Sequence, residues 1–339
     1  MNKQRYYILD TLKALSILFV ITTHFAWTRA TRLAFGFPFW IVMAVPIFML
    51  FSGFVNAASR DKHGISTFSE AFQAKSVAKK FIRFLVPYLV IAIAELFINK
   101  SLRFSSAMEY VRFFMQGAKG PGGYYVTLMI QFIFVVPAIF LIMKKNPGKG
   151  MLYAFLFTFF YELFCAVNKI SYTAYTQLIF RYTFIIAFGA FMYLNKKKVN
   201  ILWYIASFVL GAGYIVAHDY FKYESPIITM WQTTSLYGVL FIIPILALIM
   251  RFAGQVRIVP LEWIGKRTYD IFLVQMLYYA CFNGFMGRLI PNTALHLCVN
   301  IAICVGGGVL FYLIETPITN WLCKKSDSLI DRCESKRAA

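Results

Sequence analysis

The sequence predicts an all-α polytopic membrane protein with about ten transmembrane helices and both termini in the cytoplasm. Composition supports this fold class, because 60% of the 339 residues are hydrophobic and only 14% are charged. A soluble globular protein contains more charged residues than this. In addition, apolar stretches of about 20 residues, the length that crosses a bilayer as a helix, recur along the chain.

The predicted spans follow one another with short connections, and the fifth and seventh are the shortest. They cover residues 8–27, 37–58, 79–98, 124–143, 151–167, 173–194, 201–217, 228–250, 268–287 and 294–322. No connection is long enough for a separate domain. We therefore expect one membrane domain over residues 1–323, followed by a short basic cytoplasmic tail over residues 324–339.

Two connections have recognisable local features. Thr67-Phe-Ser-Glu70 has the pattern of a capping box, which predicts a short helix at the inner surface before the third span. Gly120-Pro-Gly-Gly predicts a flexible outer loop, and the Tyr124 and Tyr125 that follow it suit the membrane interface.

The net charge of +20 lies mostly in short basic clusters between apolar segments. Most of these clusters, such as Lys144-Lys145 and Lys197-Lys198, fall on connections on the same side of the membrane as the amino terminus. Positively charged connections remain in the cytoplasm, so the bias predicts cytoplasmic termini in the cell membrane. The same distribution argues for the lipid bilayer, and against nucleic acid, as the partner of these charges.

The first apolar segment is expected to be a retained span, because Asp10 and Lys13 interrupt it and no small-residue cleavage pattern follows. The six cysteines contain no C-x-x-C pair and mostly lie in apolar segments. They are typical of small core residues, so neither a disulfide framework nor a metal site is expected.

Three ionisable residues, Asp10, Lys13 and His24, lie within the first span. Lys13 and His24 are about three helical turns apart, so they share a face and are separated by roughly 16 Å along the axis. Asp10 falls on nearly the same stripe. Ionisable groups inside a bilayer are costly and usually face the bundle interior or a watery cavity, which makes the stripe a functional candidate.

Five short motifs occur in order along the chain. They are Asp10-x-x-Lys13 with His24 after ten further residues, Pro46-Ile-Phe-Met-Leu-Phe-Ser52-Gly53-Phe54, Lys80-Phe-Ile-Arg83 followed by Pro87, Gly265-Lys-Arg-Thr-Tyr-Asp-Ile-Phe-Leu, and Ile314-Glu315-Thr-Pro317. The small residues Ser52 and Gly53 also predict a close approach between helices in the second span.

These motifs, on ten spans with both ends inside, resemble the integral membrane acyltransferase family called acyltransferase 3. The resemblance covers essentially the whole chain. Lys13 and Lys80 stand where arginine is commoner in the family, which keeps the charge but loses the bidentate fork. Gln275 stands where many members carry a histidine, so a role attached to that position does not carry over.

The resemblance implies transfer of an acyl group, usually acetyl from acetyl-CoA, to a hydroxyl of a sugar or lipid-linked glycan. CoA is a cytoplasmic polyanion, so Lys80 and Arg83, one turn apart where the third span begins, are candidates to hold its phosphates. Lys13 would receive the next polar group along the pantetheine arm. The arm would then extend along the stripe and bring the thioester towards His24.

A sugar hydroxyl is a weak nucleophile until a base accepts its proton, and a neutral imidazole suits that task. We expect His24 to be this base, with an acyl-histidine intermediate as the alternative route. Asp10 lies near the opposite end of the helix and is expected to pair locally with Lys13. The simpler alternatives are a snorkelling Lys13 and an interfacial His24 without catalytic roles.

Other polar residues of the predicted spans are candidates for substrate contacts. Arg181 lies mid-depth in the sixth span and needs a partner, for which Glu95 and Glu162 are candidates, and a structural ion pair is the alternative. Glu315, in the inner part of the last span, is placed to brace the basic pocket. Candidate sugar contacts at the outer mouth, where aromatic-belt residues are also common, are Tyr124, Tyr125 and Gln131.

The function expected from these residues is that of an acyl-CoA-dependent O-acetyltransferase that modifies a cell-surface or exported glycan. A transporter or exporter of glycans or lipid-linked sugars is the main alternative, since buried charges can also line a transport path. A sensor or assembly subunit without catalysis is a third possibility. Dependence on acetyl-CoA separates the enzyme from the transporter, and tolerance of His24 replacement would indicate the non-catalytic subunit.

Overall fold

The computed structural model describes residues 6–195, 197–228 and 230–338. These residues form helices, turns and loops, and none of them lies in a strand, which confirms the predicted all-α class. Residues 1–5 and 339 of the predicted membrane domain and tail lie outside the described residues.

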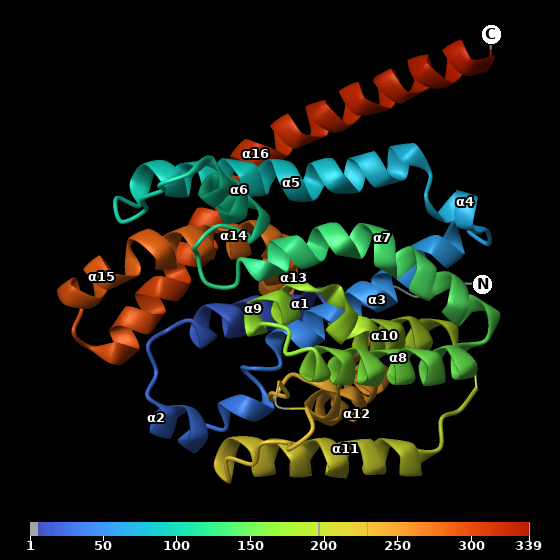
Figure 1. Cartoon of the computed structure of the whole chain (residues 1–339), viewed down its shortest axis with the longest axis horizontal. Coiled ribbons are helices and arrows are strands. Elements are labelled where there is room, and N and C mark those ends of the chain that lie inside the picture. The colour runs from blue at the N-terminus through green and yellow to red at the C-terminus, as the bar shows by residue number, and fades with distance from the viewer. Residues whose placement is uncertain (1–5, 196, 229, 339) are drawn as a thin grey trace. The chain divides into compact units, whose positions relative to one another are not determined.

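The chain divides into two compact units. Unit 1 comprises Met1–Ile65 and Ala138–Lys266, and unit 2 comprises Ser66–Pro137 and Arg267–Ala339. Helix α7 (Tyr124–Lys145) contains Pro137, the last residue of its part in unit 2, and continues into unit 1 (Figure 1).

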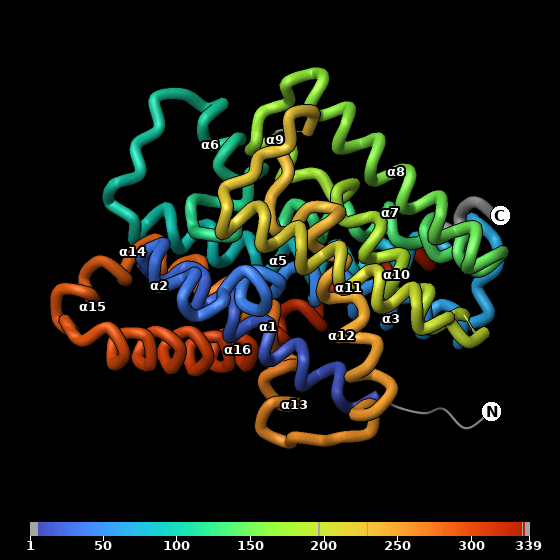
Figure 2. The backbone as a smooth tube through the Cα atoms, turned by 90° about the horizontal axis from the view of Figure 1, so that it is seen from below, coloured from blue at the N-terminus to red at the C-terminus, as the bar shows by residue number. Residues whose placement is uncertain are grey.

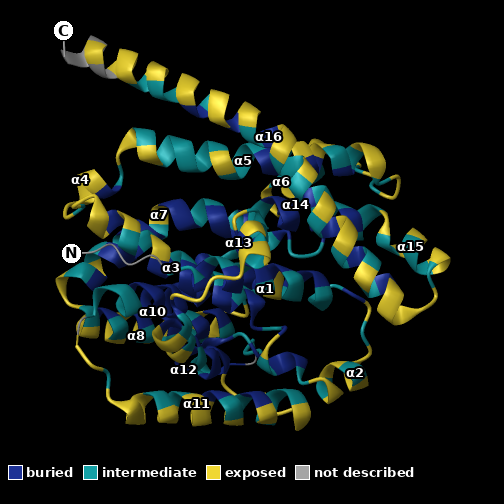
Figure 3. Ribbon diagram, turned by 180° about the vertical axis from the view of Figure 1, so that it is seen from behind, coloured by how far each residue is buried: buried dark blue, intermediate teal, exposed yellow. Residues whose placement is uncertain are grey.

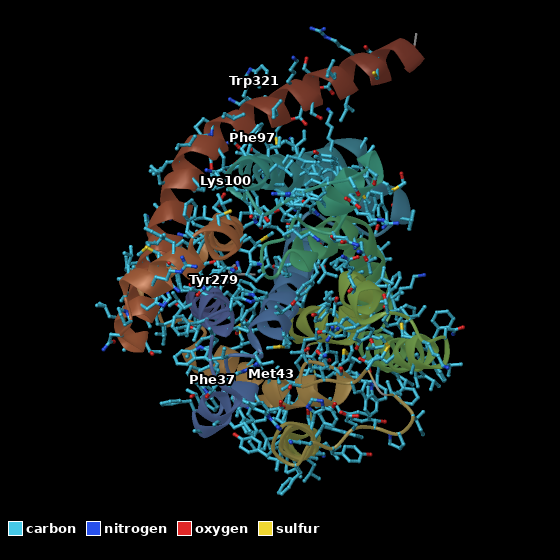
Figure 4. All side chains as sticks on the ribbon, turned by 60° about the vertical axis from the view of Figure 1, so that its left-hand side comes forward. Phe37, Met43, Phe97, Lys100, Tyr279 and Trp321 are labelled. Carbon is cyan, nitrogen blue, oxygen red and sulfur yellow. The ribbon has the colours of Figure 1, made fainter. Side chains whose placement is uncertain are left out.

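Unit 1 consists of long apolar helices joined by short helical turns. Its elements are α1 (Ile8–Thr23), α2 (Arg29–Ala34), η1 (Phe37–Phe39), α3 (Ala44–Lys62), α8 (Pro147–Val167), α9 (Tyr172–Gln177), η2 (Ile179–Tyr182), α10 (Thr183–Leu194), α11 (Ile201–Ile215), η3 (Val216–Tyr220), α12 (Leu236–Ala253) and α13 (Val259–Gly265). The segment between α2 and α3 packs inward through Phe37 and Met43, which are both buried (Figure 4).

Helices α3 and α10 pack closely against each other in unit 1. A Cβ atom at Gly53 would collide with the backbone carbonyl of Ile186, and one at Gly189 would collide with the carbonyl of Leu50. Because each helix places a glycine against the other's backbone, the two helices approach more closely than larger side chains would allow. The close approach predicted at Gly53 is therefore present.

Helix α11 packs beside α12 (Figure 2). Its only buried residues are Gly211 and Ile215. Its exposed residues include Leu202, Trp203 and Ile205, whereas half of the residues of α12 are buried (Figure 3). An apolar helix with so much exposed apolar surface is typical of a lipid-facing position.

Unit 2 contains fewer helices, of which two are long. Its elements, besides the first part of α7, are α4 (Phe68–Ala71), α5 (Ala74–Ile98), α6 (Ala107–Met115), α14 (Thr268–Cys281), α15 (Asn283–Leu289) and α16 (Thr293–Ala338). The segment predicted as a basic tail continues α16 as helix. Trp321 lies on α16 and has an exposed fraction of 58% (Figure 4).

Helix α5 is bound to both of its neighbours in unit 2. The Tyr269 hydroxyl of α14 donates to the backbone carbonyl of Phe84 in α5, with an O···O distance of 2.7 Å. Lys79 of α5 forms an ion pair with Asp327 of α16 at 2.7 Å, and Lys75 pairs with Asp331 one turn away. The acidic residues of the last helix thus neutralise part of the basic cluster at the start of α5.

The predicted capping box is present, whereas the flexibility of the glycine-rich loop and the side of the membrane on which each connection lies stay predictions. Thr67 and Glu70 form a complete capping box at the start of α4. The loop before α7 has a left-handed backbone at Gly117, Ala118 and Gly122. A Cβ atom at Gly117 would also collide with the carbonyl of Gly123, so glycine is needed at this turn.

Seven helical segments of the described residues are long and apolar enough to cross a membrane, so the chain is a multi-pass membrane protein. The other three predicted spans coincide with the shorter helices α1, α10 and α14. With 16 residues, α1 is about 24 Å long, less than the roughly 30 Å hydrocarbon core. The count of ten spans and the cytoplasmic position of both termini stay predictions.

Candidate active site

Helix α1 carries the predicted ionisable stripe in unit 1. Asp10 and Lys13 form the expected local pair, with 3.3 Å between Oδ1 and Nζ, and both side chains are partly exposed. The helix continues without a break to Thr23, so its register keeps Lys13 and His24 on one face, roughly 16 Å apart along the axis.

His24 caps the carboxyl end of α1, whereas the sequence pattern placed it inside a span that continues to residue 27. The helix ends earlier because the chain turns at this point, where the Trp27 indole N–H donates to the carbonyl of Thr22 at 2.8 Å. The His24 side chain is half-buried, and the backbone of Phe25 follows in a non-helical conformation. The imidazole therefore lies where α1 gives way to a connection.

The amino-terminal end of α1 is held by α13. A Cβ atom at Gly265 would collide with the carbonyl of Asp10, which explains the glycine that begins the fourth motif. In α13 the buried Glu262 carboxylate accepts hydrogen bonds from Lys266 Nζ and Arg257 Nε, both at 2.6 Å. These two bonds lower the pKa of Glu262 to about 2.

Lys80 and Arg83, the candidates for CoA phosphates, lie one turn apart on α5 in unit 2. Lys80 is half-buried and Arg83 is exposed. The ion pairs with α16 engage Lys79 and its neighbour Lys75, and no described carboxylate forms an ion pair with Arg83. An exposed guanidinium beside a lysine one turn away suits a phosphate group.

Glu315 of α16 belongs to a buried acidic cluster in unit 2. Its two carboxylate oxygens accept hydrogen bonds from Thr319 at 2.6 Å and from Thr316 at 2.9 Å. The carboxyl group of Asp270 on α14 lies within hydrogen-bonding reach of Glu315 and is influenced by the charge of Arg267. Two neighbouring carboxyl groups with a guanidinium nearby form a site that can exchange protons or hold a polar ligand.

The remaining candidates of unit 2 lie on or against α7. Tyr124, Tyr125 and Gln131 are half-buried on α7, and the Tyr125 ring contacts Phe272 of α14 edge-on with 5.0 Å between centroids. Gln275 of α14 is fully buried, and neither atom of its amide finds a hydrogen-bond partner among the described residues. A buried, unsatisfied amide is costly, which marks this position as unusual.

Arg181 lies in η2, a turn between α9 and α10, because the predicted sixth span is broken near Leu178, whose backbone is extended. Its guanidinium stacks over the Tyr175 ring at 4.5 Å, and the Tyr175 hydroxyl donates to Glu162 at 3.1 Å. Glu162 is fully buried and interacts electrostatically with Arg181. Of the two candidate partners, Glu162 is thus connected to Arg181 through one shared tyrosine.

Glu95, the other candidate, has a different environment within unit 2. Its carboxylate accepts a hydrogen bond from the backbone N–H of Lys119 at 3.2 Å. Asn99 and the backbone of Gly120 provide further hydrogen bonds to the same group. Glu95 therefore holds the loop that precedes α7.

The candidates thus divide between the two units. Unit 1 carries the residues of the stripe and the buried arginine, namely Asp10, Lys13, His24 and Arg181. Unit 2 carries the basic pair and the other polar candidates, namely Lys80, Arg83, Glu315, Tyr124, Tyr125 and Gln131.

Two groups were missed from the sequence. Asp270 was quoted within the fourth motif without a role, although a carboxylate in the first turn of a predicted span is a usable signal. Trp231, which donates its indole N–H to Glu162 at 2.5 Å, fell at the start of the predicted eighth span, but α12 begins only at Leu236, so Trp231 lies in the connection before it. No local pattern points to Trp231, because its partner is far away in the chain.

Comparison with known proteins agrees with the order of the motifs. A family model described as an acyltransferase domain, that of acyltransferase 3, matches residues 6–313. Searches of curated proteins and of solved structures find no match. Because the family model covers most of both units and includes four of the five motifs, ending directly before the fifth, the chain belongs to the acyltransferase 3 family.

Proposed function

We propose that this membrane acyltransferase moves an acyl group, most simply acetyl, from acyl-CoA to a hydroxyl of a cell-surface or lipid-linked glycan in the cytoplasmic membrane. The observation that supports it most strongly is the family match over residues 6–313, together with multi-pass apolar helices. The donor, the acceptor and the roles of single residues are part of the proposal.

In the proposed reaction, the imidazole of His24 accepts the proton of the acceptor hydroxyl. The hydroxyl oxygen then forms a bond to the thioester carbonyl carbon, and the C–S bond breaks. The CoA thiolate leaves and recovers the proton from the imidazolium, so the histidine ends neutral. A position at the end of α1 supports this role, because the imidazole there adjoins a connection through which an acceptor can approach.

The CoA donor would be bound by basic side chains of α5 and by the ionisable stripe of α1. Lys80 and Arg83 would bind the phosphates of CoA, and Lys13 would contact the pantetheine arm. The Asp10 carboxylate, 3.3 Å from Lys13 Nζ, would keep that ammonium group in position. The carboxyl groups of Glu315 and Asp270 are candidates for further polar contacts.

The test uses the full-length protein in liposomes with radiolabelled acetyl-CoA and a crude pool of surface glycan precursors. We expect His24→Ala to lower transfer of label to glycan by about 10²- to 10⁴-fold, the range for loss of a general base, while binding of acetyl-CoA is retained. His63→Ala is the matched control, since His63 is exposed and its imidazole Nδ1 hydrogen-bonds to the nearby Ser59 carbonyl.

Each outcome of this assay has a clear meaning. Equal transfer by wild type and His24→Ala would remove His24 from the chemical step. If the wild type neither binds nor consumes acetyl-CoA while glycans cross the liposome unchanged, the chain is a transporter instead. Loss of transfer in His63→Ala as well would show that the histidine effect is not specific to His24.

A further inference from the structure

Unit 1 contains a polar cavity of about 510 Å³ that the acyl-transfer scheme does not use. We call it the loop cavity, because it is built where three connections between helices meet. Its polar and aromatic lining residues are Arg32, Tyr172, His218, Glu224, Trp231 and 232–234. By the predicted topology, all three connections lie on the outer side of the membrane.

Hydrogen bonds between the connections hold the cavity together. The Tyr220 hydroxyl donates to the carbonyl of Leu33 at 2.8 Å, which joins the end of η3 to α2. The Tyr172 hydroxyl donates to Gln232 Oε1 at 3.0 Å, which joins the start of α9 to the segment before α12. Each bond links residues distant in the sequence, so the loops form one wall.

A buried polar network fixes this wall from behind. Glu162 accepts hydrogen bonds from the Trp231 indole N–H at 2.5 Å and from the backbone N–H of Leu236 at 3.3 Å. Arg181 Nη2 donates to Thr234 Oγ1 at 2.9 Å. The segment that lines the cavity is therefore anchored at both of its ends, and its side chains are positioned before any ligand arrives.

A π-helical turn, η3, places the charged part of the lining. It carries His218, whose Nδ1 lies 3.6 Å from the Asp219 carboxylate, and Asp219 accepts a hydrogen bond from Thr233 at 2.8 Å. The Asp219 backbone carbonyl also accepts from Arg29 at 2.8 Å. Turns of this kind are rare and occur often at functional sites.

The lining combines an aromatic surface with many neutral hydrogen-bonding groups. Trp231 and Tyr172 provide the aromatic surface, while the amide of Gln232 and the hydroxyl groups of Thr233 and Thr234 provide donors and acceptors. A sugar ring has the complementary pattern, with an apolar face and hydroxyl groups around its edge. A volume of about 510 Å³ accommodates one or two such rings.

Opposite charges balance in the lining. Arg32 and Glu224 are both exposed at the cavity, and His218 has Asp219 beside it. An excess of cations, which would indicate a phosphate or a uronic acid, is therefore absent from the described lining residues. Arginine and carboxylate groups can each bind neighbouring hydroxyl groups of an uncharged ligand.

We propose that the loop cavity binds an uncharged sugar unit of the acyl acceptor. This inference rests on the proposed function, because it assumes that the glycan is the acceptor. The connection that begins at His24 is the same one that provides Arg32. A glycan held by this connection would thus be bound by the chain segment that follows the proposed base.

The experiment measures glycan binding and acyl transfer separately. Full-length protein in lipid nanodiscs is applied to a printed array of neutral oligosaccharides and their uronic-acid-containing counterparts, at 0.05 M and about 0.5 M salt. We expect the wild type to bind neutral glycans equally at both salt concentrations, because screening weakens only interactions between charges. We expect Gln232→Ala and Tyr172→Ala to weaken this binding about tenfold.

Two further variants keep the result interpretable. Tyr153→Ala, whose tyrosine is 55% exposed on α8 compared with 53% for Tyr172, is the matched control and should bind like the wild type. Glu224→Gln replaces an exposed side chain with one of the same shape, so reduced binding there would not come from unfolding. Thermal unfolding of each variant identifies any that fail to fold.

Three results would overturn the proposal: no glycan binding by the wild type, binding only to acidic glycans at low salt, or wild-type binding by Gln232→Ala, Tyr172→Ala and Glu224→Gln. Measuring acyl transfer from acetyl-CoA distinguishes a failure of the cavity assignment from a failure of the proposed acyltransferase function. If transfer occurs and is unchanged by the three cavity variants, the enzyme assignment stands and the cavity assignment fails. If acetyl-CoA is not consumed but neutral glycans bind, the acyltransferase assignment fails, and the cavity binds a sugar that is not an acyl acceptor.

Discussion

Single side chains in unit 1 illustrate how costly charges are accommodated in an apolar protein. Glu162 is fully buried and Arg181 has an exposed fraction of only 6%. The pair is stabilised through Tyr175, Trp231 and Thr234, so the charges are surrounded by hydrogen bonds and an aromatic ring. Removing a hydrogen-bond partner from either residue would leave a buried polar group unsatisfied, which costs about 1–3 kcal/mol.

Glu262 provides a residue-scale prediction on pH. Its folded-state pKa of about 2 lies below the ordinary value of 4.5. A depressed pKa contributes stability that is fully present above about pH 4.5 and is lost as the pH falls towards about 2. We therefore expect Glu262→Gln to lower the apparent unfolding temperature at pH 5–7 relative to wild type.

The pH series checks this assignment directly. The difference in unfolding temperature between wild type and Glu262→Gln should narrow as the pH falls from about 4.5 towards 2. Glu224→Gln, at an exposed position, should leave the unfolding temperature unchanged across the series. A difference that stays constant down to pH 2 would contradict the assignment of Glu262 as an ionised hydrogen-bond acceptor.

At the scale of elements, the contact between α3 and α10 depends on backbone proximity. Gly53 and Gly189 each lie against a carbonyl group of the other helix, so a methyl group at either position requires the helices to move apart.

At the break between α9 and α10, an irregular stretch of backbone is buried within unit 1. Tyr175, Ile179 and Tyr182 around this break are almost fully buried. Irregular backbone at membrane depth is tolerated only where protein or a cavity surrounds it.

The element-scale prediction compares two glycine substitutions. Gly53→Ala should destabilise the protein by about 1–3 kcal/mol, because the added methyl group overpacks the α3–α10 contact. Gly213→Ala in α11 is the control, since no atom lies within 4 Å of its added Cβ. The control should be neutral or stabilising by up to about 1 kcal/mol, since alanine favours helix. Thermal unfolding in one detergent measures both, and equal effects would contradict the packing argument.

At the scale of the whole molecule, the sequence predicts which side of the membrane each connection faces. Basic residues cluster on alternate connections, and the chain is a multi-pass membrane protein. The free cysteines provide natural reporters. Cys333, near the end of α16, and Cys298, near its start, are both exposed, whereas Cys304 and Cys323 are buried.

The topology prediction is that Cys333 faces the cytoplasm. In a Cys298→Ala background, a membrane-impermeant maleimide should fail to label Cys333 in intact cells and should label it after permeabilisation. Cys333→Ser removes the signal and identifies the reacting thiol. Lys222→Cys, in a connection predicted to face outward, is the positive control for intact cells. Labelling of Cys333 in intact cells would reverse the predicted orientation.

The sequence by itself determined the features that depend on neighbouring residues. Apolar stretches gave the helices, the spacing of Asp10 and Lys13 gave their ion pair, and Thr67 with Glu70 gave a capping box. These features were predictable because hydropathy, helical periodicity and hydrogen bonds over three or four residues act locally. The order of the motifs likewise identified the family, which needs no spatial information.

Only the tertiary structure decided which distant residues meet. It connected Arg181 with Glu162, placed Asp270 beside Glu315, and built the loop cavity around Trp231 from three connections. It also ended α1 at Thr23, so that His24 became a helix cap. Such partnerships depend on how helices pack and where loops cross, and one hydropathy pattern is compatible with many packings. The physical reason is that helix formation is encoded within a few turns, whereas side-chain partners are chosen by contacts across the whole fold.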